Sequence, residues 1–188
     1  MRWLKPSKHR DKPKLLSAAF SLFCAAIAMV SGSAFPANDL PEYSVKAAFL
    51  LNIPDFVLWP EAGGNRRQSK RICVYGDNPF ENYLQQLIET KSDDSIELTY
   101  LETLTNVVGC HLLFISQSEK NSVDNIIKIL GNDPILTVSD IGEFARKQGM
   151  IEFNVRDNKI RMLINLNNTA NAQLKLDSNL IELSTIVN

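Results

Sequence analysis

Two cysteines and one histidine are the residues whose types first suggest chemistry. Cys73 and Cys110 lie far apart in the sequence, and His111 follows Cys110 directly. Thiolate and imidazole groups bind zinc, but these residues lack a fourth ligand at any recognisable spacing and include no Cys-x-x-Cys pair. They could also act as nucleophile and base, yet a histidine beside an oxidised cysteine is poorly placed as a base. We therefore predict no metal site, no cofactor and no enzymatic activity, thiol oxidoreduction included.

Two aspartates form a second candidate site. Asp77 and Asp140 each follow a predicted buried strand, at the edge where open α/β sheets bind ligands. Asn78 follows Asp77 in a segment with one glycine, residues 75–79, which predicts a turn and a helix cap and not a dinucleotide site. A turn or capping role is the simpler interpretation of both carboxylates. The alternative is a small-molecule site formed by these strand ends.

Trp59 is the third candidate, as an interface residue. The segment before it, Val45 to Leu51, is apolar on more than one face of a predicted helix, so it is either deeply packed or partly offered to a partner. Aromatic residues are common anchors of protein interfaces, although a core position would also explain Trp59. The basic residues that follow predict a solvated loop and not a lipid contact: Arg66, Arg67, Lys70 and Arg71.

The N-terminus predicts export. Residues 1–14 carry six basic residues and one acidic residue, an apolar run follows from Leu15 to Val30, and small residues end at Ala34. This order is typical of a secretory signal peptide cleaved after Ala34, and the apolar run is short for a membrane span. An uncleaved N-terminal anchor is the alternative. We expect residues 1–34 to be removed and residues 35–188 to form a single domain.

Cleavage would change both the charge and the cysteine count. Removal of residues 1–34 from the 188-residue chain leaves 154 residues with 14 basic and 20 acidic side chains, a net charge of −6 that argues against nucleic acid as a partner. Loss of Cys24 leaves Cys73 and Cys110 in an oxidising compartment as a candidate disulfide. On neighbouring strands they could form a bond worth about 4 kcal/mol. It would be a permanent staple, the simpler interpretation, or a redox-sensitive bond.

Alternating apolar strands and helices place these residues in a three-layer α/β domain of the Rossmann-like or flavodoxin-like type. We expect a mostly parallel sheet with a C-terminal antiparallel hairpin, and a kink at Pro54 in a first helix that begins near Leu40. The predicted strands span 71–76, 95–101, 110–116, 134–138, 150–155 and 159–166. The predicted helices span 78–90, 118–130 and 142–148, the last ending at Gly149, and a final helix begins near Thr169 with an interruption around 177–178.

Several sequence blocks together resemble the YfiR family of periplasmic proteins over residues 42–187. The blocks are Glu42 to Leu50 with Asn52, Phe56 and Trp59-Pro60; Cys73 to Phe80; Cys110 to Ser116; Ile135 to Asp140; and Phe144, Gly149-Met150-Ile151, Ile164-Asn165 and Leu174-Lys175-Leu176. The chain departs from the family at Pro54 and at Gln148, where a double glycine is usual. It also has one cysteine pair where some relatives have two.

The resemblance implies a non-catalytic periplasmic repressor that binds the sensory part of an inner-membrane diguanylate cyclase and lowers cyclic di-GMP and biofilm formation. It also implies a disulfide between Cys73 and Cys110, and release by an outer-membrane lipoprotein or by a change in redox state. A second copy of the chain is a further candidate partner. The alternative function is a small-molecule-binding accessory protein of an outer-membrane uptake system. The candidate partner or ligand surface comprises Asn52, Trp59, Asp77, Asn78, Asp140 and Asn165.

Overall fold

The computed structural model describes residues 42–60, 69–91 and 95–188. The predicted signal peptide with Cys24, the predicted helix start near Leu40, and Arg66 and Arg67 of the basic loop lie outside these residues. None of the helices in the three described ranges combines the length and the apolarity that crossing a membrane requires.

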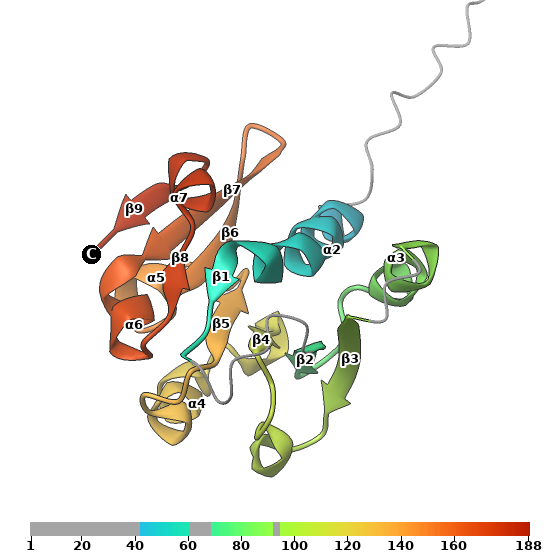
Figure 1. Ribbon diagram of the computed structural model, residues 1–188, viewed down its shortest axis with the longest axis horizontal. Helices are drawn as coiled ribbons and strands as arrows, with labels where there is room; N and C mark the ends of the chain where they lie inside the picture. Colours follow the sequence, from blue (N-terminus) through green and yellow to red (C-terminus); the bar gives the residue numbers. More distant parts are fainter. Residues whose placement is uncertain (1–41, 61–68, 92–94) are drawn as a thin grey trace, which may run out of the picture. The chain divides into compact units, whose positions relative to one another are not determined.

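One mixed sheet forms the centre of the fold (Figure 1). Within the described residues its strands are β2 (Lys70–Tyr75), β3 (Ile96–Leu101), β4 (Leu112–Ile115), β5 (Leu136–Ser139), β6 (Ile151–Arg156), β7 (Lys159–Asn165) and β9 (Thr185–Val187). Their order is β3-β2-β4-β5-β6-β7-β9. The first five are parallel, β7 is antiparallel to β6, and β9 is parallel to β7. The predicted mostly parallel sheet and its hairpin are thus confirmed, and β2 lies between β3 and β4.

Helices cover both faces of this sheet, which gives the predicted three layers (Figure 1). On one face, α2 (Glu42–Asn52) and α3 (Tyr83–Lys91) pack their buried apolar side chains on alternate residues of β2 and β4, among them Ile72 and Phe114. On the other face, α4 (Val123–Leu130) packs on the intervening residues, among them Cys73 and Leu113. The buried side chains of α4 recur at helical spacing, as expected of an amphipathic helix: Val123, Ile126 and Leu130.

The prediction of a kink at Pro54, with the helix continuing beyond it, is wrong, because α2 ends before Pro54. The helix stops at Asn52, and Pro54 lies in a 3₁₀ turn, η1 (Ile53–Phe56), because proline has no N–H to donate and disfavours a helical residue before it. The chain then extends through β1 (Val57–Leu58), which pairs antiparallel with β8 (Lys175–Leu176) in a second small sheet. This turn and strand carry the chain to Trp59.

The prediction of a helix starting at Asn78 is wrong, because this segment folds as a turn. The Asn78 side chain accepts a hydrogen bond from the Phe80 N–H at 3.0 Å and donates one to the Glu81 carbonyl at 2.9 Å. Glu81 has a φ of 51°, a left-handed conformation that interrupts a helix, so α3 begins only at Tyr83. Similarly, the predicted helix from residue 118 is a 3₁₀ turn, η3 (Gln117–Glu119), followed by α4 from Val123.

The single final helix predicted from Thr169 is also wrong. The structure has α6 (Leu166–Asn171), β8, α7 (Ser178–Glu182) and β9 in its place. Asn165 caps α6 and Asp177 caps α7, each accepting a hydrogen bond from a backbone N–H two or three residues later. The predicted interruption around residues 177–178 is therefore the start of a separate helix. The six predicted strands agree with the observed strands to within two residues at either end.

Gly149 follows the short helix α5 (Phe144–Lys147), as predicted. Its φ lies outside the left-handed region, and a Cβ placed there would overlap the ring of Phe144. The Gly149 N–H donates to the Phe144 carbonyl at 2.8 Å, which holds the backbone against the ring. Glycine is required here by close approach and not by backbone conformation.

We predict that Gly149→Ala destabilises the protein by about 1–3 kcal/mol, because the added methyl group must displace a fully packed aromatic ring. Gly142→Ala is the matched control, since a Cβ at Gly142 meets nothing within 4 Å. Urea unfolding followed by circular dichroism measures both. Equal stability of the two variants would contradict the packing explanation.

Candidate functional site

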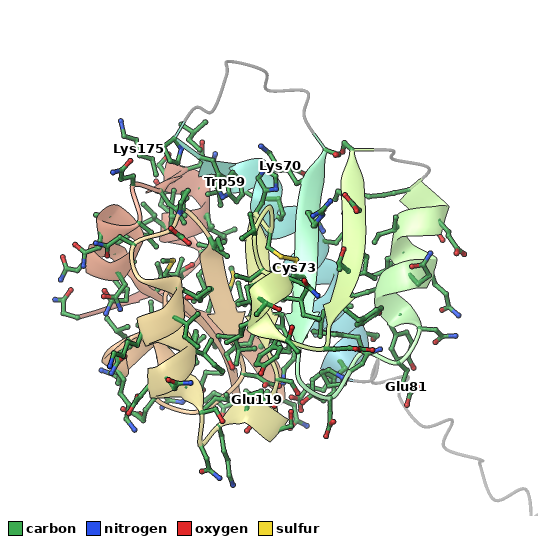
Figure 2. All side chains as sticks on the ribbon, turned by 90° about the horizontal axis from the view of Figure 1, so that it is seen from below. Trp59, Lys70, Cys73, Glu81, Glu119 and Lys175 are labelled. Carbon is green, nitrogen blue, oxygen red and sulfur yellow. A yellow bond between two sulfur atoms is a disulfide. The ribbon has the colours of Figure 1, made fainter. Side chains whose placement is uncertain are left out.

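The predicted surface residues do not form one cluster. Asp77 and Asp140 lie at the C-terminal ends of β2 and β5, whereas Trp59 lies at the opposite edge of the sheet, beside the residues that begin the strands. Figure 2 shows the two edges: Trp59, Lys70 and Lys175 mark one, and Glu81 and Glu119 mark the other. The two edges must therefore be considered separately.

At the C-terminal edge, Asp140 is the acceptor of a buried network. Its Oδ2 atom accepts hydrogen bonds from Lys46 Nζ at 2.6 Å and from the Tyr43 hydroxyl at 2.8 Å. The Lys46 side chain is 3% exposed and the Asp140 side chain is also 3% exposed, so this is a buried ion pair. Lys46 also lies 4.3 Å from the Tyr43 ring centroid and contacts Glu42, whose side chain is about half exposed. These contacts tie the first turns of α2 to the end of β5.

The same network fills the edge where open α/β sheets bind ligands. The Tyr43 ring packs edge-on against Phe80, which packs in turn against Phe114 of β4. Burial, followed by the hydrogen bond and the charge of Asp140, raises the pKa of Tyr43, which keeps its hydroxyl protonated as a donor. The Oδ2 atom of Asp140 is therefore occupied by the protein's own side chains, and its buried Oδ1 atom has no hydrogen-bond partner in the described part of the chain. The burial of this carboxylate argues against the small-molecule site expected at Asp77 and Asp140.

The remaining polar candidates have local roles. Asn78 forms the turn described above, and the Asp77 N–H donates to Ser118 Oγ at 3.0 Å. Asn52 is exposed at the end of α2, where its amide donates to the Ala48 carbonyl. Asn165 is buried: it donates to the Ala145 carbonyl at 2.9 Å and caps α6. Asn165 therefore holds the C-terminal segment and is not part of an exposed surface.

The structure contains the bond between Cys73 and Cys110, with a Cα separation of 5.9 Å. Cys73 lies within β2, but Cys110 precedes β4 and does not begin it, so the bond joins a strand to the segment that leads into its neighbour. Both cysteines are buried in the core beneath α4. Burial keeps reductants away from the sulfur atoms, which favours the staple interpretation.

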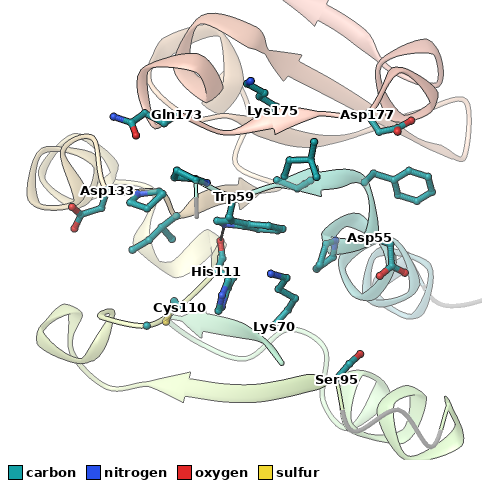
Figure 3. A pocket seen from close by; sticks show the side chains of 18 of the residues that line it. Asp55, Trp59, Lys70, Ser95, Cys110, His111, Asp133, Gln173, Lys175 and Asp177 are labelled. Atoms are coloured by element: carbon teal, nitrogen blue, oxygen red, sulfur yellow. Dashed lines mark hydrogen bonds between the residues drawn. The ribbon is translucent and has the colours of Figure 1, made fainter. Parts of the chain in front are cut away.

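The N-terminal edge carries a groove of about 1300 Å³, here called the Trp59 groove. Figure 3 shows Trp59 in its middle, between β8 on one side and the strand starts on the other. The Trp59 indole N–H donates to the His111 carbonyl at 3.3 Å, and the two rings meet edge-on at 5.6 Å. Trp59 is thus partly buried on one face and borders the groove on another. The lining of the groove includes Leu58, Trp59, Lys70, Val108, His111 and Lys175.

Sequence reasoning missed two features of these sites. It did not single out Lys46, although Lys46 is the only charged residue between Tyr43 and Pro54, and a lysine inside an apolar helix signals a buried ion pair. No cavity was predicted at the N-terminal edge either, because the Trp59 groove is lined by segments that lie far apart in the sequence. Among the described residues, no group of three or more histidine, cysteine, aspartate or glutamate side chains could hold a metal ion.

Comparison with known proteins gives the family. The YfiR/HmsC-like family model matches residues 43–185, which is most of the chain. The chain belongs to the YfiR/HmsC-like family. The members of this family are periplasmic, non-catalytic regulators of diguanylate cyclases. No curated protein matches the chain.

In this YfiR/HmsC-like protein, the matched region runs from Tyr43 of the buried network to Thr185 at the start of β9. It therefore includes both edges of the sheet and the disulfide. The network at one edge is closed, whereas the groove at the other is open to solvent at Leu58 and Val108. Of the two edges, the Trp59 groove is the better candidate for contact with another protein.

We predict that the Cys73→Ala/Cys110→Ala variant loses about 4 kcal/mol of stability, because the bond closes a loop with a sequence separation of 37 residues. Urea unfolding with and without dithiothreitol measures the loss. Reductant should destabilise the wild-type protein once it reaches the buried bond, and should leave the double variant unchanged. A double variant as stable as the oxidised wild type would exclude the staple role.

We also predict that Lys46→Met costs about 3–5 kcal/mol, because it leaves the buried Asp140 carboxylate without its cation, and that Asp140→Asn costs less, because Lys46 keeps Glu42 as a partner. The double variant should lose less than the two single losses added together, which a double-mutant cycle by urea unfolding measures. Glu42→Gln is the control, with a loss below about 1 kcal/mol, since Glu42 is half exposed. If the losses in unfolding free energy of the two single variants added exactly, Lys46 and Asp140 would not be energetically coupled, which would contradict the prediction.

Proposed function

We propose that this protein binds the periplasmic sensory part of an inner-membrane diguanylate cyclase and holds the cyclase inactive, which lowers cyclic di-GMP. The observation that carries the proposal is the family match over residues 43–185. Release of the cyclase through an outer-membrane lipoprotein, or through a change in redox state, stays a prediction from the resemblance, as does a homodimer.

Two structural observations support a binding role. The C-terminal edge of the sheet, where enzymes of this architecture hold ligands, is filled by Tyr43, Lys46 and Phe80. The opposite edge offers an open groove with Trp59 in its middle, and aromatic side chains in hollows are common anchors of protein interfaces. Both observations favour contact with a protein over catalysis or the capture of a small molecule.

Repression requires that the protein bind the inactive state of the cyclase more tightly than the active state, because a ligand with equal affinity for both shifts no equilibrium. To shift the cyclase from mostly active to almost fully inactive, the protein must bind the inactive state about 10⁴-fold more tightly than the active state. The buried disulfide and the signal peptide predicted at residues 1–34 are consistent with action in an oxidising compartment outside the cytoplasm.

Co-expression with the membrane cyclase encoded nearest to this gene tests the proposal. Cells that export the protein should contain less cyclic di-GMP, measured by mass spectrometry, and the protein should copurify with the detergent-solubilised cyclase. Deletion of residues 2–34 is the matched control, because a protein retained in the cytoplasm cannot reach a periplasmic domain. Unchanged cyclic di-GMP together with no recovery of the cyclase, with or without reductant, would exclude this function for that pair.

A further inference from the structure

The size of the Trp59 groove points to a polypeptide segment as its occupant. Its volume of about 1300 Å³ exceeds the usual range for small-molecule pockets, which is about 300–1000 Å³. It runs past several segments: β1, β8, the start of β2 and the residues before β4.

Two apolar residues of the groove are exposed to solvent. Leu58 is 55% exposed and Val108 is 80% exposed, and both border the groove that also contains Trp59. Exposed apolar side chains that gather around a hollow typically mark an interaction site. The occupant should therefore carry apolar side chains of its own.

The charged residues of the groove favour an acidic group in its middle. No carboxylate among the described residues lies within ion-pair distance of Lys70 or Lys175, and the Lys70 ammonium lies over the Trp59 ring, 4.9 Å from its centroid. Asp177 is occupied, because it caps α7 through the Asn179 N–H. The other two carboxylates, Asp55 and Asp133, lie at opposite ends of the groove, with Trp59 and Lys70 between them (Figure 3).

His111 adds a second donor to this cationic centre. Its Nδ1 atom accepts a hydrogen bond from the Arg71 N–H at 3.1 Å, so the neutral imidazole carries its proton on Nε2. Burial, followed by the charges of Lys70 and Arg71, lowers the pKa of His111 and keeps the ring neutral at neutral pH. The Nε2–H group and the Lys70 ammonium are thus two donors without an acceptor in the described part of the chain.

We propose that the Trp59 groove binds an extended segment of the partner protein in which an acidic side chain stands between apolar ones. The carboxylate accepts hydrogen bonds from Lys70 and His111 beside the Trp59 ring, and the flanking apolar side chains cover Leu58 and Val108. This inference rests on the proposed function for the identity of the partner, but its recognition chemistry can be tested without the cyclase.

Trp59 provides the readout, because the other tryptophan of the chain, Trp3, lies in the predicted signal peptide. The probe is the acetylated, amidated peptide Thr-Val-Leu-Glu-Val-Leu-Thr, titrated into protein purified from the periplasm while tryptophan fluorescence is recorded. The same peptide with glutamine in place of glutamate is the matched probe. We expect the glutamate peptide to bind saturably. The dissociation constant of the glutamine peptide should be higher by a factor of about ten or more, because only the carboxylate makes charge-assisted hydrogen bonds.

Two variants locate the contact on the protein. Lys70→Ala should weaken binding of the glutamate peptide about tenfold and should leave the glutamine peptide unaffected. Lys128→Ala, on the exposed side of α4, should bind both peptides as the wild type does. Circular dichroism confirms that both variants fold. If Lys70→Ala does not fold, Lys70→Met, which keeps the aliphatic stem beside the Trp59 ring, takes its place with the same expectation.

Equal binding of the two peptides, or no saturable change with the glutamate peptide at millimolar concentration, would overturn the groove proposal. Saturation by glutarate alone would overturn it in favour of a small-molecule site. A fluorescence change that depends on the concentration of the protein alone, with dimers seen by analytical ultracentrifugation, would mean that a second copy of the chain occupies the groove. This result would also overturn the proposal. Recovery of the cyclase with no peptide binding would refute only the groove, whereas peptide binding with no effect on any cyclase would refute only the proposed function.

Discussion

A buried ion pair between Lys46 and Asp140 joins the first helix to the end of β5. A charge removed from water must be paired, so the ammonium group of Lys46 can be buried only where the end of β5 meets α2. This contact fixes the start of α2 at the C-terminal edge of the sheet. The helix has 11 residues and is about 16 Å long, so it carries the chain across the sheet towards the other edge. Pro54 then ends the helix, and the extended residues of β1 bring Trp59 to the N-terminal edge.

The disulfide fixes the opposite side of the groove. Cys110 directly precedes His111, and Cys73 lies two residues after Arg71, whose backbone exchanges hydrogen bonds with His111 in both directions. The covalent bond and this pair of hydrogen bonds therefore hold the same short segment against β2. The carbonyl of His111 in turn accepts the indole N–H of Trp59. The position of Trp59 thus follows from both the ion pair at one edge and the disulfide near the other.

The sequence predicted those parts of the fold that depend on local pattern. Unbroken apolar runs such as Leu112–Ile115 identified the buried strands, and Pro54 marked a break in the first helical segment, although it was predicted as a kink. The wrong predictions concern parts of the fold that depend on long-range contacts or that consist of very short elements. β8 and β9 have two and three residues, too few to show a period of two. Asp140 could be singled out, but its partner Lys46 is 94 residues away, and only the tertiary fold brings them together.

The bond between Cys73 and the segment before β4 has a mechanical consequence. Lys70 begins β2, and His111 precedes β4, so a molecule held by both residues would pull on two adjacent strands at the same end. These strands are hydrogen-bonded along their length and cross-linked near that end, which prevents one from sliding past the other. The backbone on this side of the groove therefore loses little conformational freedom when the groove is filled, which lowers the entropic cost of binding.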